Sequence, residues 1–380
     1  MEKYRPIRAI ISGGGTGGHI FPALSIADKL KEACPETEIL FVGAEGRMEM
    51  EKVPAAGYRI TGLPISGLQR RLTFSNLAVP FKLIRSLALA GKTIDSFKPD
   101  IAIGVGGYAS APLLWMAEKK GIPTLIQEQN GFAGLTNKIL GKKAGKICVA
   151  YEGMERFFPT DKIVITGNPI RKEIHPYDAA TRQEAMEFYG LDPKKRHIFI
   201  VGGSLGSGTL NRSVKKWISE GRPQGKDIEI LWQCGRYYKA DTDSFMQQAC
   251  ASDSTLAQEI RYFDFIKRMD LAYAAADIVV SRSGASSVSE LCAAHKAVIF
   301  VPSPNVAEDH QTHNAMALVR KDAAMIVTDA QAPDILMETA CSLVRDKEKT
   351  AAMEKNIAAL ARPDAAEAIV REIYSTIDER

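Results

Sequence analysis

The sequence lacks the features of membrane-spanning and disulfide-stabilised proteins. No uncharged apolar run reaches about 18 residues, so no segment is expected to span a bilayer and any membrane contact is expected to be peripheral. The opening stretch, MEKYRPIRAIISGGG, holds too few apolar residues for a signal peptide. The six cysteines form no C-x-x-C pair and have no accompanying histidine spacing; they are Cys34, Cys148, Cys234, Cys250, Cys292 and Cys341. Reduced thiols of a cytosolic protein fit this pattern better than disulfides or a zinc site.

The chain also lacks an excess of charge of either sign. Its 49 Lys and Arg residues and 45 Asp and Glu residues give a formal net charge of +4. Nucleic acid is therefore not an expected partner, whereas a local basic patch facing a membrane stays open. With 380 residues, the chain exceeds the size at which one hydrophobic core keeps growing, so two domains are expected.

Short apolar segments alternate with longer stretches of helical periodicity. In the first half the candidate strands are 7–12, 37–44, 100–107, 123–129, 145–150 and 162–169, and a helix with a first-turn proline is expected at 21–33. The pattern restarts at 196–218 with a strand, a glycine-rich turn and a helix, and continues with strands at 228–235, 261–266, 276–284 and 297–304. Such repeats predict two doubly wound α/β domains with parallel sheets, connected near 166–182. A final helix, broken near 361–368, is expected to return to the first domain.

Three glycine-rich turns follow predicted strands: GGGTGG at 13–18, GVGGYAS at 104–110 and GGSLGSG at 202–208. Such a turn lets the backbone approach a ligand and places N–H groups at a helix start, where an anion is favoured. The alternative is that the glycines only permit tight strand–helix packing. The dinucleotide fingerprint is matched loosely and the Walker A lysine is absent. Two turns in one half and one in the other indicate group transfer between two diphosphates.

The segment SRSGASSVSELCAAHKAVIFVPSP, residues 281–304, adds a strand, a glycine turn, hydroxyl residues and a helix. Ser286, Ser287 and Ser289 suit a phosphate or uracil at the helix start. Glu290 suits two vicinal ribose hydroxyls, although an ordinary helix-start acid is the alternative. The polar segment NVAEDHQTHNAMAL, residues 305–318, is suited to sugar hydroxyls.

With these residues in view, the chain resembles the MurG family of peptidoglycan N-acetylglucosamine transferases. The segments that carry the resemblance are GGGTGGHIFPALSIA, GVGGYASAPLLWMA, EQNGFAGLTNKIL, GNPIR, GGSLGSGTLN, and SRSGASSVSEL with DHQTHNA. They occur in the family's order and spacing over nearly the whole chain. The resemblance implies the GT-B fold, in which two Rossmann-like, doubly wound parallel-sheet domains face a central cleft. The expected parts are an N-terminal acceptor and membrane-associated domain (1–167), a C-terminal donor-binding domain (168–362) and a C-terminal helix (363–380).

The resemblance also implies a reaction and a location. The expected enzyme is an inverting hexosyltransferase that moves N-acetylglucosamine from UDP-N-acetylglucosamine to the C4 hydroxyl of undecaprenyl-diphospho-N-acetylmuramyl-pentapeptide, converting lipid I to lipid II. This step belongs to cell-wall biogenesis and so bears on cell shape and cell division. The expected location is peripheral, on the cytoplasmic face of the bacterial inner membrane, with other cell-wall synthesis proteins as candidate partners. The resemblance requires no metal-binding D-x-D motif, and neither a metal nor a cofactor is expected.

Site residues are implied motif by motif. For the donor they are Thr16, Gly17, Gly18, Asn130, Arg171, Ser204, Ile266, Ala285, Ser286, Ser287, Val288, Ser289, Glu290 and Gln311. For the acceptor diphosphate they are Gly14, Gly15, Gly104, Gly106 and Gly107. The candidate catalytic residues are His19, Tyr108, Glu128 and Asn130. His19 is the leading base because its ordinary pKa lies closest to neutral, and its alternative role is a helix-start hydrogen bond that shapes the loop.

A membrane-facing patch is expected between residues 70 and 92. Phe74, Leu77, Phe81 and Ile84 recur at helical spacing among basic residues, and Trp115 extends the surface. A core-packed helix with solvated basic edges is the alternative, and Pro80 complicates one continuous helix.

Rival functions stay open at this point. They are another GT-B lipid glycosyltransferase, a UDP-N-acetylglucosamine 2-epimerase, or a non-catalytic UDP-sugar-binding scaffold.

Overall fold

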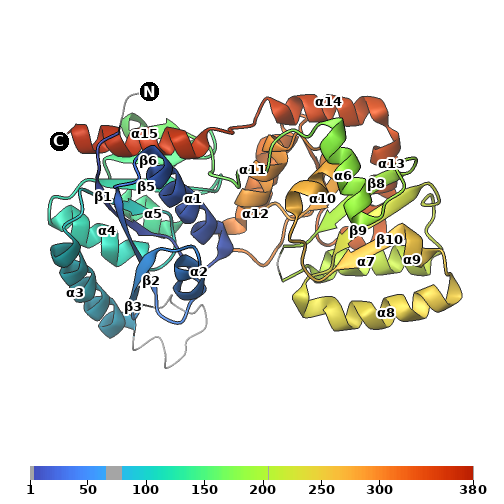
Figure 1. Cartoon of the computed structure of the whole chain (residues 1–380), viewed down its shortest axis with the longest axis horizontal. Coiled ribbons are helices and arrows are strands. Elements are labelled where there is room, and N and C mark those ends of the chain that lie inside the picture. Colours follow the sequence, from blue (N-terminus) through green and yellow to red (C-terminus); the bar gives the residue numbers. More distant parts are fainter. Residues whose placement is uncertain (1–3, 66–78, 204, 380) are drawn as a thin grey trace. The chain divides into compact units, whose positions relative to one another are not determined.

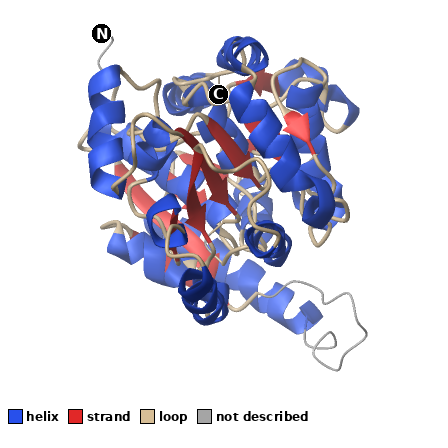
Figure 2. Cartoon of the chain, turned by 90° about the vertical axis from the view of Figure 1, so that its right-hand side faces the viewer, coloured by secondary structure: helices blue, strands red, loops and turns tan. Residues whose placement is uncertain are grey.

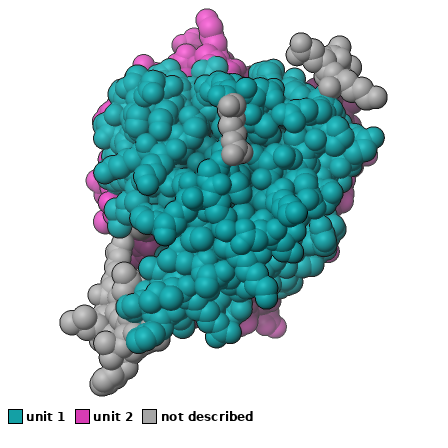
Figure 3. Space-filling model, turned by 90° about the vertical axis from the view of Figure 1, so that its left-hand side faces the viewer, with its two compact units in different colours: residues 1–170, 362–380 teal, residues 171–361 magenta. Residues whose placement is uncertain are grey.

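The computed structural model describes residues 4–65, 79–203 and 205–379 (Figure 1). The chain forms two compact units, which Figure 3 shows in different colours. Unit 1 comprises Met1–Ile170 and Arg362–Arg380, and unit 2 comprises Arg171–Ala361.

In the described part of unit 1, the strands form a seven-stranded parallel sheet in the order β3-β2-β1-β4-β5-β6-β7. The strands are β1 (Arg8–Ser12), β2 (Glu38–Ala44), β3 (Arg59–Leu63), β4 (Ile101–Gly104), β5 (Thr124–Glu128), β6 (Lys146–Val149) and β7 (Ile163–Ile165). The helices are α1 (Gly17–Ala33), α2 (Glu49–Ala55), α3 (Val79–Phe97), α4 (Ser110–Lys119), α5 (Leu135–Leu140) and α15 (Ala365–Asp378).

Each face of this sheet carries its own core, because successive side chains of a strand point to opposite faces. Ile11 of β1 packs in a cluster with Ile26 of α1 and Ile373 of α15. Ile10, the neighbouring residue, belongs to a second cluster that includes Leu113 of α4. Both faces of the sheet are therefore covered, as a parallel sheet requires.

In unit 2, the described strands form a six-stranded parallel sheet in the order β10-β9-β8-β11-β12-β13. The strands are β8 (Arg196–Val201), β9 (Ile228–Gln233), β10 (Ile260–Phe263), β11 (Ile278–Ser281), β12 (Val298–Phe300) and β13 (Met325–Ile326). The helices are α6 (Ala179–Tyr189), α7 (Gly208–Ser219), α8 (Lys239–Ser252), α9 (Leu256–Glu259), α10 (Met269–Ala275), α11 (Ala285–Ala293), α12 (His310–Val319), α13 (Ala332–Arg345) and α14 (Lys347–Ala358). Figure 2 shows strands lying between helices in this architecture.

The first helix differs from the predicted one in a way that affects the site. It begins at Gly17 rather than at residue 21, after Thr16 in an extended conformation with φ of −145°. Pro22 therefore lies inside α1, where its missing N–H removes the hydrogen bond to the carbonyl of Gly18. As a consequence, His19 stands in the first turn of a helix.

The C-terminal helix α15 packs within unit 1. The Tyr374 hydroxyl donates to the Arg5 carbonyl at 2.8 Å, and the Tyr374 ring stacks on Tyr4 with centroids 4.4 Å apart. Gly145 lies so close to Thr376 that a Cβ would come within 2.9 Å of its methyl group. The last helix thus completes the core of the unit that begins the chain. None of the helices in the described residues is long and apolar enough to cross a membrane.

Candidate active site

The glycine-rich turns of unit 1 lie at the point where the strand order reverses. β1 and β4 are neighbours in the sheet, and their following helices α1 and α4 begin after residues 13–16 and 105–109. In open parallel sheets, ligands bind beyond the carboxyl ends of the strands at such a point. This edge of unit 1 is therefore the candidate site.

The two turns interlock, and only glycine fits where they touch. The Gly14 N–H donates to the Gly106 carbonyl at 3.3 Å. A Cβ on Gly107 would come within 2.5 Å of the Gly14 carbonyl oxygen, and a Cβ on Gly106 would come within 2.6 Å of the His19 ring. Both Gly106 and Gly107 have positive φ, of 97° and 90°. The Ser110 hydroxyl closes the second turn by donating to the Gly106 carbonyl at 2.8 Å.

His19 is half-buried against this second turn. Its Nδ1 lies 3.0 Å from the Gly14 carbonyl oxygen. Because a carbonyl can only accept, Nδ1 must carry the proton, and the neutral ring then has its lone pair on Nε2. The loop thus fixes the tautomer in which Nε2 can act as a base.

The predicted acceptor-diphosphate residues are placed unevenly. The Gly15 N–H donates to Glu49 Oε2 at 2.9 Å, and the Gly14 N–H is already bonded to Gly106. Gly104 is the last residue of β4, where a Cβ would strike Leu114. We therefore expect an anion at the starts of α1 and α4, next to Thr16, Gly17 and Gly18 and to Gly106 and Gly107.

Glu128, a predicted catalytic residue, is a buried organiser of its loop. It ends β5 with 2% exposure. Its carboxylate accepts from Asn137 Nδ2 at 2.8 Å, from the Asn130 N–H at 3.1 Å and from the Gly134 N–H at 3.2 Å. Asn130 Nδ2 adds a longer contact of 3.4 Å. These bonds shape the loop that presents Asn130.

Sequence reasoning missed a buried amide network beside this loop. Gln127 Nε2 donates to Asn168 Oδ1 at 2.9 Å, and Asn168 Nδ2 donates to the Gln129 carbonyl at 3.0 Å. Gln129 Nε2 reaches the Val105 carbonyl at 2.8 Å, next to the second glycine turn. The motifs EQN and GNP contain Gln129 and Asn168, and Gln127 directly precedes EQN, but their sequence separation gives no sign that these residues bond to each other.

The exposed apolar side chains of unit 1 include several predicted for the membrane patch. Phe81 and Ile84 of α3 are 76% and 66% exposed, and Trp115 of α4 is 47% exposed. The buried face of α3 carries other residues, among them Ile94 and Phe97. Pro80 lies in the first turn of α3 and leaves the helix continuous. Phe74 and Leu77 lie outside the described residues.

Tyr108 stands just before α4, in the turn that holds Gly106 and Gly107. Its side chain is 50% exposed. It is thus presented on the same turn that packs against His19.

Unit 2 repeats the arrangement between β8 and β11. The turn after β8 packs on the end of β9, since a Cβ on Gly206 would come within 2.1 Å of the Cys234 carbonyl oxygen. Ser204, predicted to approach the donor diphosphate, lies outside the described residues. After β11, helix α11 starts at Ala285, and the first turn also contains Ser286, Ser287 and Val288. The Ser286 Oγ is buried and makes no hydrogen bond in the described part of the chain.

Gln233 at the end of β9 links two parts of this edge, and no sequence motif indicates this role. Its Nε2 donates to the Gly203 carbonyl at 2.9 Å, and its Oε1 accepts the Ile266 N–H at 2.9 Å. The Ile266 N–H is thus held by the protein, and the carbonyl is the backbone group of Ile266 suited to a uracil edge.

Glu290 and Arg171, two predicted donor residues, form an ion pair. Arg171 donates from Nε to Glu290 Oε1 at 2.9 Å and from Nη2 to Oε2 at 3.0 Å, and the Tyr273 hydroxyl donates to Oε2 at 3.2 Å. Glu290 is 7% exposed. Burial raises its pKa, while the Arg171 guanidinium opposes that rise. Burial is the main cause that raises the pKa of the Tyr273 phenol, and the Glu290 carboxylate raises it further.

Gln311 at the start of α12 is held by its side-chain oxygen. Its Oε1 accepts the Ser303 N–H at 2.9 Å, and its carbonyl accepts the Ser283 hydroxyl at 2.8 Å. Asn314 Nδ2 bonds the Ser283 carbonyl at 3.2 Å, so α12 is tied to the turn before α11. Because the side-chain oxygen of Gln311 accepts this bond, its amide NH₂ group is the part of the side chain that can donate to a ligand. Ser289 lies one turn further into α11.

No cluster of three metal-ligating side chains occurs among the residues that the structure describes. A D-x-D string does occur at Asp241–Asp243, but it lies on α8. Asp241 pairs with Lys215 at 2.6 Å, and Asp243 pairs with Lys239. Each of the two carboxylates is thus paired with a lysine.

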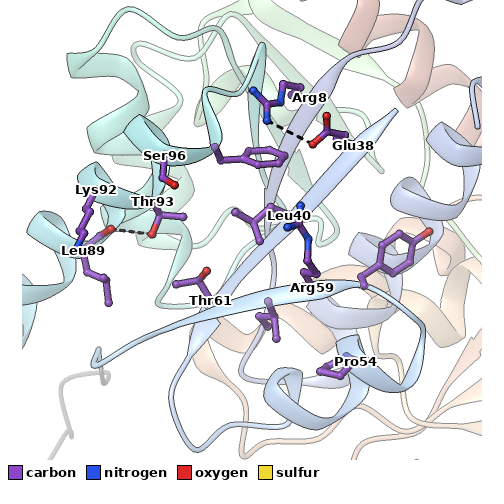
Figure 4. Close-up of a pocket in the computed structure, with 13 residues that line it drawn as sticks. Arg8, Glu38, Leu40, Pro54, Arg59, Thr61, Leu89, Lys92, Thr93 and Ser96 are labelled. Atoms are coloured by element: carbon purple, nitrogen blue, oxygen red, sulfur yellow. Dashed lines mark hydrogen bonds and ion pairs between the residues drawn. The ribbon is translucent and has the colours of Figure 1, made fainter. Parts of the chain in front are cut away.

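A separate hollow of about 800 Å³ lies at the other edge of the unit 1 sheet (Figure 4). Arg8, Glu38 and Arg59 on its wall are the first residues of β1, β2 and β3. The hollow is therefore at the amino ends of the strands, away from the glycine turns, and we assign it no part in the site.

Two parallel-sheet units with glycine turns at their switch points define the GT-B class of glycosyltransferase. Models of the glycosyltransferase family 28 N-terminal and C-terminal domains match residues 9–149 and 197–369. The chain belongs to the family of UDP-N-acetylglucosamine–N-acetylmuramyl-(pentapeptide) pyrophosphoryl-undecaprenol N-acetylglucosamine transferases. The resemblance and the fold class predicted from the motifs are thereby confirmed.

Individual relatives span the full length. The transferase of that name from Parabacteroides distasonis is 54% identical over 380 residues, covering 100% of both chains. The one from Porphyromonas gingivalis strain W83 is 51% identical and covers 99% of this chain and 97% of its own. The crystal structure of Acinetobacter baumannii MurG matches with a TM-score of 0.77 and 29% identity, covering 97% of this chain and all of that one. A UDP-N-acetylglucosamine 2-epimerase structure, 12% identical with a TM-score of 0.64, covers 99% of this chain and 97% of its own and shares the fold alone.

Proposed function

We propose that this chain transfers N-acetylglucosamine from UDP-N-acetylglucosamine to the C4 hydroxyl of undecaprenyl-diphospho-N-acetylmuramyl-pentapeptide. The product is the β-linked disaccharide of lipid II in peptidoglycan synthesis. The family relationship over the full length supports this reaction. The observation that carries the mechanism is the His19 Nδ1 bond to the Gly14 carbonyl, which leaves Nε2 as the basic nitrogen at the carboxyl edge of unit 1.

Unit 2 supplies the groups for the donor. The first-turn N–H groups of α11 and the buried Ser286 hydroxyl suit the diphosphate, since a helix start favours an anion. Glu290 suits the ribose hydroxyls, and the Ile266 carbonyl suits the uracil N3–H. The Gln311 amide suits hydroxyls of the transferred sugar.

The Arg171–Glu290 pair has to adjust when the donor binds. A ribose on Glu290 competes with Arg171 for the same two oxygens. The Arg171 side chain is 46% exposed, so it can turn towards a diphosphate at low cost. This exchange would place a positive charge near the leaving group while the ribose takes its place on Glu290.

The reaction then follows from these groups. His19 Nε2 accepts the proton of the acceptor C4 hydroxyl while the oxygen of that hydroxyl attacks the anomeric carbon of the donor sugar. The bond from that carbon to the UDP oxygen breaks, and its electron pair leaves with UDP. The N-terminus of α11 and Arg171 stabilise the charge that develops on the diphosphate. Attack from the face opposite UDP inverts the anomeric configuration.

Unit 1 supplies the acceptor and membrane groups. The starts of α1 and α4 suit the acceptor diphosphate. Phe81, Ile84 and Trp115 lie exposed among basic residues, an arrangement that suits the cytoplasmic surface of an anionic membrane. The Lys143 ammonium lies 6.0 Å from the Trp115 ring centroid, so a basic group also lies next to the exposed aromatic side chain of α4.

Transfer of labelled N-acetylglucosamine from UDP-N-acetylglucosamine to a soluble lipid I analogue tests the proposal. A disaccharide with the large H1–H2 NMR coupling of a β-linkage is expected. UDP binding without a disaccharide would instead identify a binding scaffold. Conversion of UDP-N-acetylglucosamine to UDP-N-acetylmannosamine without acceptor would identify an epimerase.

A further inference from the structure

One peptide group of the first glycine turn bonds at both of its ends. Its N–H, from Gly15, donates to Glu49 Oε2 at 2.9 Å. Its carbonyl, from Gly14, accepts from His19 Nδ1 at 3.0 Å. Glu49, the Gly14–Gly15 peptide and His19 therefore form one hydrogen-bonded series.

Glu49 is built into this position. It is the first residue of α2 and is 1% exposed. Its second oxygen, Oε1, accepts the Ala44 N–H at 3.0 Å, which anchors the carboxylate to the end of β2. A Cβ on Gly14 would come within 2.2 Å of that oxygen, and a Cβ on Gly43 within 2.5 Å of the Glu49 Cγ. The two glycines thus leave the space that the side chain fills.

We infer that Glu49 is a positioning residue that sets the orientation and basicity of His19 through the Gly14–Gly15 peptide group. The inference rests on the proposed function, in which His19 accepts the proton of the acceptor hydroxyl. It adds a residue of the GRMEME segment to the site, although the glycine motif itself does not include it. A carboxylate that orients a catalytic histidine usually bonds to it directly, whereas here a peptide group lies between them.

The physical effect is polarisation of the bridging peptide. A hydrogen bond to a carboxylate is stronger than a neutral one, and bonds in series strengthen one another. Electron density drawn onto the Gly14 carbonyl makes it a better acceptor for Nδ1–H, most of all when the ring becomes imidazolium. Two bonds and one peptide separate the charges by roughly 8 Å, at which a carboxylate raises a histidine pKa by on the order of one unit.

Other titratable or charged side chains stand on the turns next to His19 and Glu49. The β4–α4 turn that packs against His19 contributes Tyr108, and the β2–α2 turn before Glu49 contributes Glu45 and Arg47. These last two are exposed and of opposite sign, so solvent screens them and their fields oppose each other. Glu49 is the buried carboxylate among these groups.

Glu49→Gln tests the inference because it removes the charge but keeps the shape. Glu38→Gln is the matched control, since it removes one carboxylate from the exposed start of the neighbouring β2. Glu49→Asp keeps the charge and provides a second variant should the glutamine fold poorly. The measurements are the NMR titration of the His19 imidazole and the pH profile of kcat/KM for the lipid I analogue.

In Glu49→Gln, the His19 pKa is expected to fall by about one unit, which moves the acid limb of the profile to lower pH by the same amount. The expected kcat at neutral pH is about tenfold lower, with UDP binding in unit 2 unchanged. Glu38→Gln should match wild type, and Glu49→Asp should keep the limb near its wild-type position. A His19 pKa unchanged in folded Glu49→Gln, or lowered equally in Glu38→Gln, overturns the inference. The proposed function fails separately, if the wild-type protein forms no disaccharide.

Discussion

Replacing Glu290 by Gln is expected to weaken donor binding without destabilising the fold at neutral pH. The carboxylate is 7% exposed and accepts two bonds from Arg171 and one from Tyr273. Gln keeps one acceptor oxygen in nearly the same place. The Arg171 side chain, 46% exposed, can return to water when its ionic partner is lost.

The sign of the stability effect follows from the pKa of Glu290. Burial raises that pKa above its ordinary value despite the opposing Arg171 charge. A carboxylate with a raised folded-state pKa contributes stability below its unfolded pKa and loses it as pH rises through the folded one. At neutral pH, wild type thus bears the cost of the ionised buried group, and Glu290→Gln does not. The difference in unfolding free energy should therefore move in favour of Gln as the pH rises from about 4 to 7.

The expected effect on UDP binding is larger, and here the Gln variant is the weaker one. Hydrogen bonds to a charged group contribute about 1.5–3 kcal/mol, and Gln cannot accept from both ribose hydroxyls. Loss of one such bond corresponds to about 10- to 100-fold weaker binding of UDP. Isothermal titration with UDP measures it, with Glu338→Gln on the exposed face of α13 as the control. UDP affinity within twofold of wild type, or a stability loss that grows with pH, would refute the reasoning.

Three further results are expected. Gly106→Ala forces a side chain into a backbone with φ of 97° and against the His19 ring. The kcat should therefore fall at least 100-fold, and the unfolding free energy in chemical denaturation should fall by about 1–3 kcal/mol. Near-wild-type values would contradict the packing. Phe81→Ser with Ile84→Ser should reduce co-sedimentation with phosphatidylglycerol vesicles at least tenfold, whereas the exposed Phe188→Ser of unit 2 should not, and equal binding by all three proteins would remove the membrane patch. The transfer rate should stay within twofold in excess EDTA, and a loss restored by Mg²⁺ would show a metal requirement.

The repeated strand–helix pattern was sufficient to predict two parallel-sheet units because central strands are continuous apolar runs. β1, β8 and β11 fall within predicted segments. The sheet-edge strands β3 and β13 were not predicted. RITGL carries a glycine and a threonine on a half-buried edge, and Met325–Ile326 is only two residues long. The edge strands β7 and β10 were predicted, so an edge position alone does not explain the two misses; the polar sequence of β3 and the shortness of β13 do.

Residues within one motif could be placed from the sequence, whereas contacts between motifs could not. The glycine turns and His19 could be placed from spacing alone. The link from Glu49 to Gly15 spans 34 residues, and the pairing of Arg171 with Glu290 spans 119. Local patterns do not record which distant polar groups share a bond. Gly14 and Gly15 are examples: they were predicted to bind the acceptor diphosphate, but their N–H groups already donate to Gly106 and Glu49 within the protein.

The role of His19 is tested most directly by single-turnover transfer with His19→Gln at saturating UDP-N-acetylglucosamine and lipid I analogue. Gln keeps a polar side chain of similar length but cannot accept a proton at neutral pH. The account predicts a rate about 10²- to 10⁴-fold below wild type, with UDP affinity and unfolding temperature unchanged. A rate within twofold of wild type would contradict it.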